Sequence, residues 1–100
     1  MFVVIWQFRV KPQHISDFER NYGANGAWAQ LFRTDPAYHR TVLQRDLKDH
    51  SRYVTTDIWK DEASYRAFQE RSRRQYQELD SVFVAFTESE TLIGYFEVIE

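Results

Sequence analysis

A strand passes directly into a helix in the run Asp57-Ile58-Trp59-Lys60-Asp61-Glu62-Ala63-Ser64-Tyr65. The residues from Ser51 to Trp59 are mostly β-branched or aromatic, a composition typical of a strand. The Asp61 carboxylate can accept backbone N–H groups at the start of a helix. Apolar side chains then recur at helical spacing, which predicts one helix from Asp61 to Phe83 along the stripe Tyr65, Phe68, Ser72, Tyr76, Leu79 and Phe83.

The residues before and after this run predict further strands and a further helix. Phe2 to Val10 and Tyr38 to Asp46 are predicted strands, and the second of them forms a hairpin with Ser51–Trp59. A helix interrupted by glycines lies between the first two strands, and Leu92 to Ile99 is the last predicted strand. The order strand, helix, strand, strand, helix, strand is that of the ferredoxin-like split βαβ fold, an α+β architecture with a four-stranded antiparallel sheet.

The first strand is apolar on both of its faces, since Phe2, Val4, Trp6 and Phe8 alternate with Val3 and Ile5. Two helices cover only one face of a four-stranded sheet. A second copy of the chain is the simplest cover for the other face, so the pattern predicts a homodimer.

Composition indicates one globular domain over residues 1–100 and excludes several classes of protein. Thirteen basic and fifteen acidic residues provide no positive field for nucleic acid, and the absence of cysteine excludes disulfides and thiolate metal sites. The apolar run Phe2–Trp6 is cut by Gln7 and Arg9, so we expect neither a signal peptide nor a membrane span. These features are typical of a cytoplasmic protein.

Three segments resemble the antibiotic biosynthesis monooxygenase superfamily of dimeric α+β barrels. The segments are Val3-Val4-Ile5-Trp6 running into Val10-Lys11-Pro12, the run Asp57 to Tyr65 followed by Phe68, and Ile93-Gly94-Tyr95-Phe96. The resemblance covers nearly the whole chain and implies a homodimer with a cavity between sheet and helices in each subunit. It also implies oxidation of phenols, quinols or anthrones by molecular oxygen, with no metal or other cofactor.

The resemblance extends to single positions. Trp59 matches the tryptophan that ends the third strand in this superfamily, and Tyr65 stands where some of its oxygenases carry a pocket tyrosine. Thr55 replaces an asparagine that some members hold. Phe68 and Gln69 occupy the places where haem-degrading members carry a histidine ligand, so haem degradation of that type is not expected.

Candidate site residues follow from strand alternation and from side-chain chemistry. Asp57 and Trp59 share a strand face with Thr55, and His39 is the best candidate for a general base. The side chains expected to bind substrate are Trp28, Phe32, Arg33, Tyr65 and Phe68. The alternative is structural, with Trp59 in the core, Asp57 paired with an arginine across the sheet or the dimer, and His39 in a structural role. The three histidines show no metal-ligand spacing.

The leading hypothesis is therefore a cofactor-free monooxygenase that acts on a small aromatic molecule, with Asp57, Trp59 and His39 as catalytic candidates. The competing hypothesis is a non-catalytic homodimer, either a ligand carrier or a structural module whose aromatic residues fill the core.

Overall fold

The computed structural model describes all residues from 1 to 100. The four strands are β1 (Phe2–Val10), β2 (Tyr38–Arg45), β3 (Arg52–Trp59) and β4 (Thr87–Glu97). The helices are α1 (Ile15–Tyr22), α2 (Ala27–Phe32), α3 (Glu62–Arg71) and α4 (Arg73–Phe83), with short 3-10 turns at Pro12–His14 and Val84–Phe86. The strands form one antiparallel sheet in the order β2-β3-β1-β4. The predicted ferredoxin-like α+β fold is confirmed.

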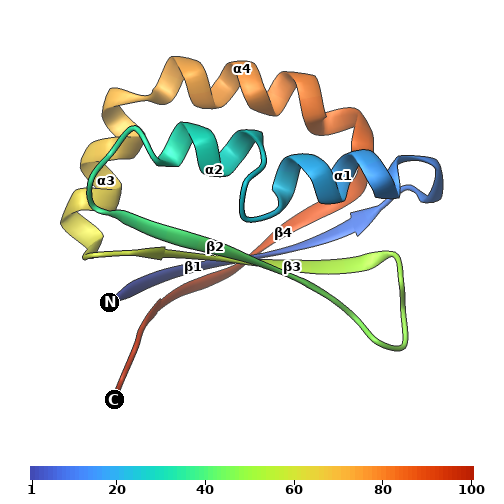
Figure 1. The fold of residues 1–100 in the computed structure, drawn as a ribbon, viewed down its shortest axis with the longest axis horizontal. Helices are drawn as coiled ribbons and strands as arrows, with labels where there is room; N and C mark the ends of the chain where they lie inside the picture. Colours follow the sequence, from blue (N-terminus) through green and yellow to red (C-terminus); the bar gives the residue numbers. More distant parts are fainter.

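All helices lie on one side of the sheet, with α2 beneath α4 and the C-terminus leaving on the other side (Figure 1). Because strand side chains alternate, β1 turns Phe2, Val4, Phe8 and Val10 toward the helices, where all four are buried. The core is mostly aromatic, and its fully buried ring-bearing side chains are Trp59, Tyr53, Phe18 and Phe68.

The last strand begins earlier than its composition predicts. β4 starts at Thr87 rather than Leu92, and its polar first half pairs with the C-terminal half of β1, where Glu90 lies opposite Phe8. The prediction was wrong here because this pairing uses backbone groups, which polar side chains do not prevent. One consequence is that Glu90 is carried onto the side of the sheet that faces the helices.

The predicted single helix from Asp61 to Phe83 is in fact two helices. Asp61 does begin it, because its carboxylate accepts the Ser64 N–H at 2.7 Å. The helix ends at Arg71, because the next residue, Ser72, has a φ of −107° and a ψ of 18°, outside the helical region, and α4 starts at Arg73. No glycine or proline marks this break. It allows α3 to pack at the end of β3 while α4 crosses over α2 (Figure 1).

The turn between α1 and α2 is tight, and it depends on Gly26. A Cβ atom at this position would lie only 2.3 Å from the carbonyl oxygen of Asn21. Glycine therefore allows the chain to reverse here and to place α2, with Trp28 and Phe32, over the sheet.

Candidate functional site

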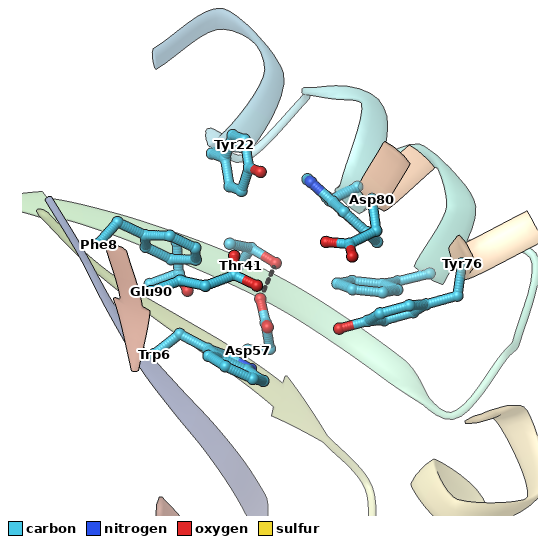
Figure 2. A pocket seen from close by; sticks show the side chains of 11 residues that line it. Trp6, Phe8, Tyr22, Thr41, Asp57, Tyr76, Asp80 and Glu90 are labelled. Atoms are coloured by element: carbon cyan, nitrogen blue, oxygen red, sulfur yellow. Dashed lines mark hydrogen bonds between the residues drawn. The ribbon is translucent and has the colours of Figure 1, made fainter. Parts of the chain in front are cut away.

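A cavity of about 130 Å³ lies between the helix-facing side of the sheet and helices α1, α2 and α4 (Figure 2). Its walls combine six aromatic rings with hydroxyl and carboxyl groups. The lining residues are Trp6, Phe8, Tyr22, Trp28, Phe32, Thr41, Thr55, Asp57, Tyr76, Asp80 and Glu90. A concave apolar site with a few convergent polar groups is the usual form of a small-molecule site.

Asp57 is the most deeply buried carboxylate in this cavity. It lies on β3, its exposed fraction is 8%, and its Oδ1 accepts a hydrogen bond of 2.6 Å from the Thr41 hydroxyl of β2. Thr41 has only one hydroxyl hydrogen, so the Tyr38 hydroxyl, 2.7 Å from it, donates to Thr41. Burial raises the pKa of the Asp57 carboxyl to about 6, and the bond from Thr41 opposes part of this rise.

Such a carboxyl group is suited to proton transfer. A general base is most effective when its pKa lies near the working pH, because it is then deprotonated and still basic enough to accept a proton. Within the single chain, Asp57 forms no ion pair with an arginine. The carboxylate is directed toward the cavity and lies close to Thr41 (Figure 2).

Two tyrosines line the cavity from the helices. Burial raises the pKa of Tyr22 on α1 to about 12, and it also raises the pKa of Tyr76 on α4. Both hydroxyls therefore stay protonated near neutral pH and can donate hydrogen bonds to a ligand. The indole N–H of Trp28 is a further donor, because it is buried and forms no hydrogen bond of normal geometry, although its interaction with the Tyr22 hydroxyl lowers the pKa of that group in part.

Asp80 on α4 and Glu90 on β4 complete the polar lining. The pKa of Glu90 is raised, first by burial and then by the negative charge of Asp80. Sequence reasoning missed both residues. Asp80 follows Tyr76 by one helical turn, a spacing that could have placed the two on one face of α4. No sequence signal places Glu90 at the site, because the polar composition of its segment does not predict a strand.

The structure brings only some of the predicted site residues together. Asp57, Trp28 and Phe32 line the cavity. Trp59, Tyr65 and Phe68 lie outside its lining, in a cluster where the ring of Trp59 is 5.4 Å from Tyr65, 5.0 Å from Phe68 and 5.7 Å from Phe32. These side chains therefore pack behind the part of the cavity wall that Phe32 forms.

His39 and Arg33 are exposed and do not reach the cavity. Arg33 donates hydrogen bonds to the carbonyl oxygen of Ala24 and to Oδ1 of Asn25, in the turn between α1 and α2. His39 lies on β2 next to the buried Tyr38, at a shift of register in the pairing with β3, and its side chain is exposed. No group of three His, Cys, Asp or Glu side chains is arranged to hold a metal ion.

The titration of Asp57 predicts a dependence of stability on pH. A carboxyl whose pKa rises from 3.8 to about 6 on folding binds its proton more tightly in the folded state. Its contribution to the free energy of unfolding is full at low pH and is lost as pH rises through about 6. Asp57→Asn keeps an acceptor for Thr41 but carries no charge. We expect it to raise the free energy of unfolding near pH 7 by about 2–3 kcal/mol, the equivalent of a pKa shift of about two units.

Urea unfolding of both proteins across the acidic to neutral range tests this. The difference between the two curves isolates Asp57, because the other groups around the cavity, Tyr22, Tyr76, Asp80 and Glu90, are present in both proteins. Parallel curves would show that Asp57 titrates at its ordinary pKa.

The fold and the site together define a class of small α+β proteins that enclose an aromatic cavity between one antiparallel sheet and its helices. The family model for antibiotic biosynthesis monooxygenase matches residues 1–78. The chain belongs to this family.

Solved structures share the fold at low sequence identity. A candidate antibiotic biosynthesis monooxygenase from Deinococcus radiodurans is 11% identical with a TM-score of 0.78, over 100% of this chain and 94% of that one. A counterpart from Nitrosomonas europaea is 18% identical with a TM-score of 0.71 over the whole of both chains. SnoaB, a cofactor-independent oxygenase from Streptomyces nogalater, is 19% identical with a TM-score of 0.72, over 99% of this chain and 93% of that one.

No curated protein matches the chain significantly. None of the helices combines the length and apolar character needed to cross a membrane.

Proposed function

We propose that the protein is a cofactor-free monooxygenase that oxidises a small phenol, quinol or anthrone-like molecule inside the aromatic cavity. The observation that carries the proposal is Asp57, a buried carboxyl in an aromatic cavity with a pKa raised to about 6. Membership of the family supports the same reaction class, as does the fold shared with a cofactor-independent oxygenase.

The cavity suits a flat apolar ring with one polar edge. Trp6, Phe8 and Phe32 offer aromatic surface, and aromatic pairs gain about 0.5–1.5 kcal/mol beyond the burial of area. Thr55 and Thr41 offer hydroxyls on the sheet side, near Asp57. A ring that enters with its hydroxyl toward β3 therefore places an acidic O–H or C–H group within reach of the Asp57 carboxylate.

The chemistry needs one base and molecular oxygen. Asp57 takes a proton from the activated CH₂ group of an anthrone or from the O–H group of a phenol, and the resulting carbanion or phenolate transfers an electron to oxygen. A C–O bond then forms to give a hydroperoxide, which loses water and leaves a carbonyl. For an anthrone the balance is CH₂ + O₂ → C=O + H₂O, and for a phenol it is C–OH + C–H + O₂ → two C=O + H₂O. In both, carbon is oxidised, one oxygen atom enters the product and the other leaves as water.

Trp59, Tyr65 and Phe68 have a positioning role in this proposal. Phe32, which lines the cavity, packs against both Trp59 and Phe68 at ring distances of 5.7 Å. These rings hold the wall at a fixed distance from Asp57 and exclude water behind it. His39 and Arg33 take no part in the step.

Oxygen uptake by chelator-treated protein tests the proposal, with anthrones, naphthoquinols and single-ring phenols as substrates. Thr55→Leu fills part of the cavity, and Thr56→Leu makes the same change on the opposite face of β3. We expect the wild-type protein and Thr56→Leu to catalyse oxygen uptake and Thr55→Leu to lose it. The product should contain ¹⁸O when the reaction is run under labelled oxygen. Ligand binding without catalysed uptake would contradict oxygenase activity and favour a binding module instead.

We also propose that the protein is a homodimer whose sheets face each other. The side of the sheet without helices carries the half-buried apolar residues Ile5, Val42, Val54 and Ile58, and Phe96, which is 46% exposed. Contiguous apolar surface of this kind is typical of an interface. Two copies related by a two-fold axis would cover it and close the two sheets into a barrel.

A charge at the centre of this face is expected to separate the subunits. Ile5→Glu places a carboxylate between the paired sheets, where desolvation costs several kcal/mol, so the variant should be monomeric. Ser16→Glu, on the exposed side of α1, is the matched control and should remain dimeric. Light scattering after gel filtration measures the mass of each protein. A monomeric wild type at micromolar concentration would contradict the proposal.

A further inference from the structure

The charged side chains that line the cavity are all acidic. Asp57, Asp80 and Glu90 contribute three carboxyl groups, and none of the eleven lining residues is lysine, arginine or histidine. A substrate that becomes an anion would be repelled here, because like charges in a partly desolvated site oppose each other. The reaction proposed above forms such an anion, so a compensating positive charge is needed.

The three carboxyl groups come from different elements and surround one space. Asp57 projects from β3 and Glu90 from β4, on the two sides of β1, and Asp80 comes from α4 on the opposite wall (Figure 2). The negative charge of Asp80 raises the pKa of Glu90, so the two groups interact. Glu90 is the most exposed of the three, which places the Asp80–Glu90 pair where the cavity meets solvent.

Polar groups of this cavity are left without partners. Asp57 is more than nine-tenths buried, yet only its Oδ1 accepts a hydrogen bond and its Oδ2 accepts none. The N–H of Trp28, whose side chain is equally buried, forms no hydrogen bond of normal geometry, although its interaction with the Tyr22 hydroxyl lowers the pKa of that group in part. Buried polar groups are normally paired, so a free acceptor and a free donor in one cavity indicate a ligand that supplies both an O–H or N–H and an acceptor.

The aromatic walls also favour positive charge. A cation over the face of tryptophan or tyrosine is attracted by about 0.5–2 kcal/mol, and the rings of Trp6, Trp28 and Tyr76 line the same cavity as the carboxylates. Aromatic rings together with carboxylates form the usual recognition site for an organic ammonium ion.

We propose that the ligand is a single-ring phenolic amine whose ring occupies the aromatic cavity and whose ammonium group lies between Asp80 and Glu90. The inference rests on the proposed function, since it names the substrate class of the same cavity. The volume of about 130 Å³ fits one ring, as a cavity of about 150 Å³ holds benzene in another protein. The phenol hydroxyl then faces Asp57, and the ammonium ion balances the anion formed when Asp57 takes the proton.

Three matched probes test the charge of the ligand. Tyramine, para-ethylphenol and para-hydroxyphenylpropionate share a phenol ring and differ in carrying a positive, neutral or negative side chain. Titration calorimetry at neutral pH and low salt should show tyramine binding at least about tenfold more tightly than para-ethylphenol, the factor expected for one charge-assisted hydrogen bond. The propionate should bind most weakly.

Variants locate the ammonium group. Asp80→Asn and Glu90→Gln should each reduce the affinity for tyramine about three- to tenfold and leave that for para-ethylphenol unchanged. Glu88→Gln, an exposed glutamate two positions earlier on β4 that does not line the cavity, is the matched control and should change neither.

The outcomes separate this inference from the proposed function. Equal or tighter binding of para-ethylphenol, or an unchanged tyramine affinity in both variants, would overturn the amine assignment, while oxygen uptake with neutral phenols would still support the oxygenase. Tight, variant-sensitive tyramine binding without oxygen uptake would support the amine site and contradict the oxygenase. Absence of binding by all three probes would overturn the amine assignment.

Discussion

Replacing Asp57 with asparagine is expected to lower kcat for oxygen uptake by about 100- to 10,000-fold, the usual contribution of a positioned general base. Asparagine keeps the size of the side chain and an acceptor for the Thr41 hydroxyl, so the cavity keeps its shape. Substrate affinity should therefore change by less than kcat. Steady-state oxygen uptake and direct ligand titration measure the two quantities separately.

The pH profile gives a second readout of the same group. Asp57 acts as a base only when it is deprotonated, so kcat should fall as pH drops below about 6, the pKa that burial gives this carboxyl. Asp17→Asn, on the surface of α1, is the control for loss of a carboxylate and should leave both kcat and its profile unchanged. An Asp57→Asn enzyme with wild-type kcat would exclude Asp57 as the base.

Replacing Trp59 with alanine is expected to cost about 3–5 kcal/mol of unfolding free energy, as for other fully buried large aromatic side chains. Trp59 has no exposed surface, and its ring lies within 5.7 Å of the rings of Phe32, Tyr38, Tyr65 and Phe68. Such a loss is a large part of the stability of a small domain and corresponds to a fall in melting temperature of roughly 15–30 °C. Thermal and urea unfolding measure it.

Trp59→Phe separates packing from chemistry. Its indole N–H is buried without a partner, so phenylalanine removes an unsatisfied donor while keeping most of the ring contacts. We expect this variant to lose less than about 2 kcal/mol of stability and to keep most of its activity, as a positioning residue should. A folded Trp59→Phe protein without activity would instead make the indole a catalytic group.

Much of the architecture follows from local sequence pattern. The apolar strand from Phe2 to Val10 and the cap at Asp61 have local causes, namely side-chain alternation and a carboxylate placed to accept a backbone N–H. The glycines at 23 and 26 mark the break between α1 and α2 for a similar reason, since a side chain at Gly26 would strike the backbone of Asn21.

Two boundaries were not predictable in this way. Thr87 to Thr91 joins the sheet because its backbone N–H and C=O groups pair with those of β1. Backbone pairing of this kind leaves no pattern of side chains from which the strand could be predicted. The helical stripe continues through Ser72 although the helix does not, because the change of direction is set by packing of α3 against β3 and of α4 against α2.

The site shows the same division between local and tertiary causes. The sequence by itself determined that Asp57 shares a strand face with Thr55, because side chains on a strand alternate. Only the tertiary structure brought Asp80 from α4 and Glu90 from β4 to that face, and left His39 outside the cavity. Carboxylates so distant along the chain meet only through the folding of helices onto the sheet. Burial of Asp57, which moves its pKa toward neutrality, arises from the same packing.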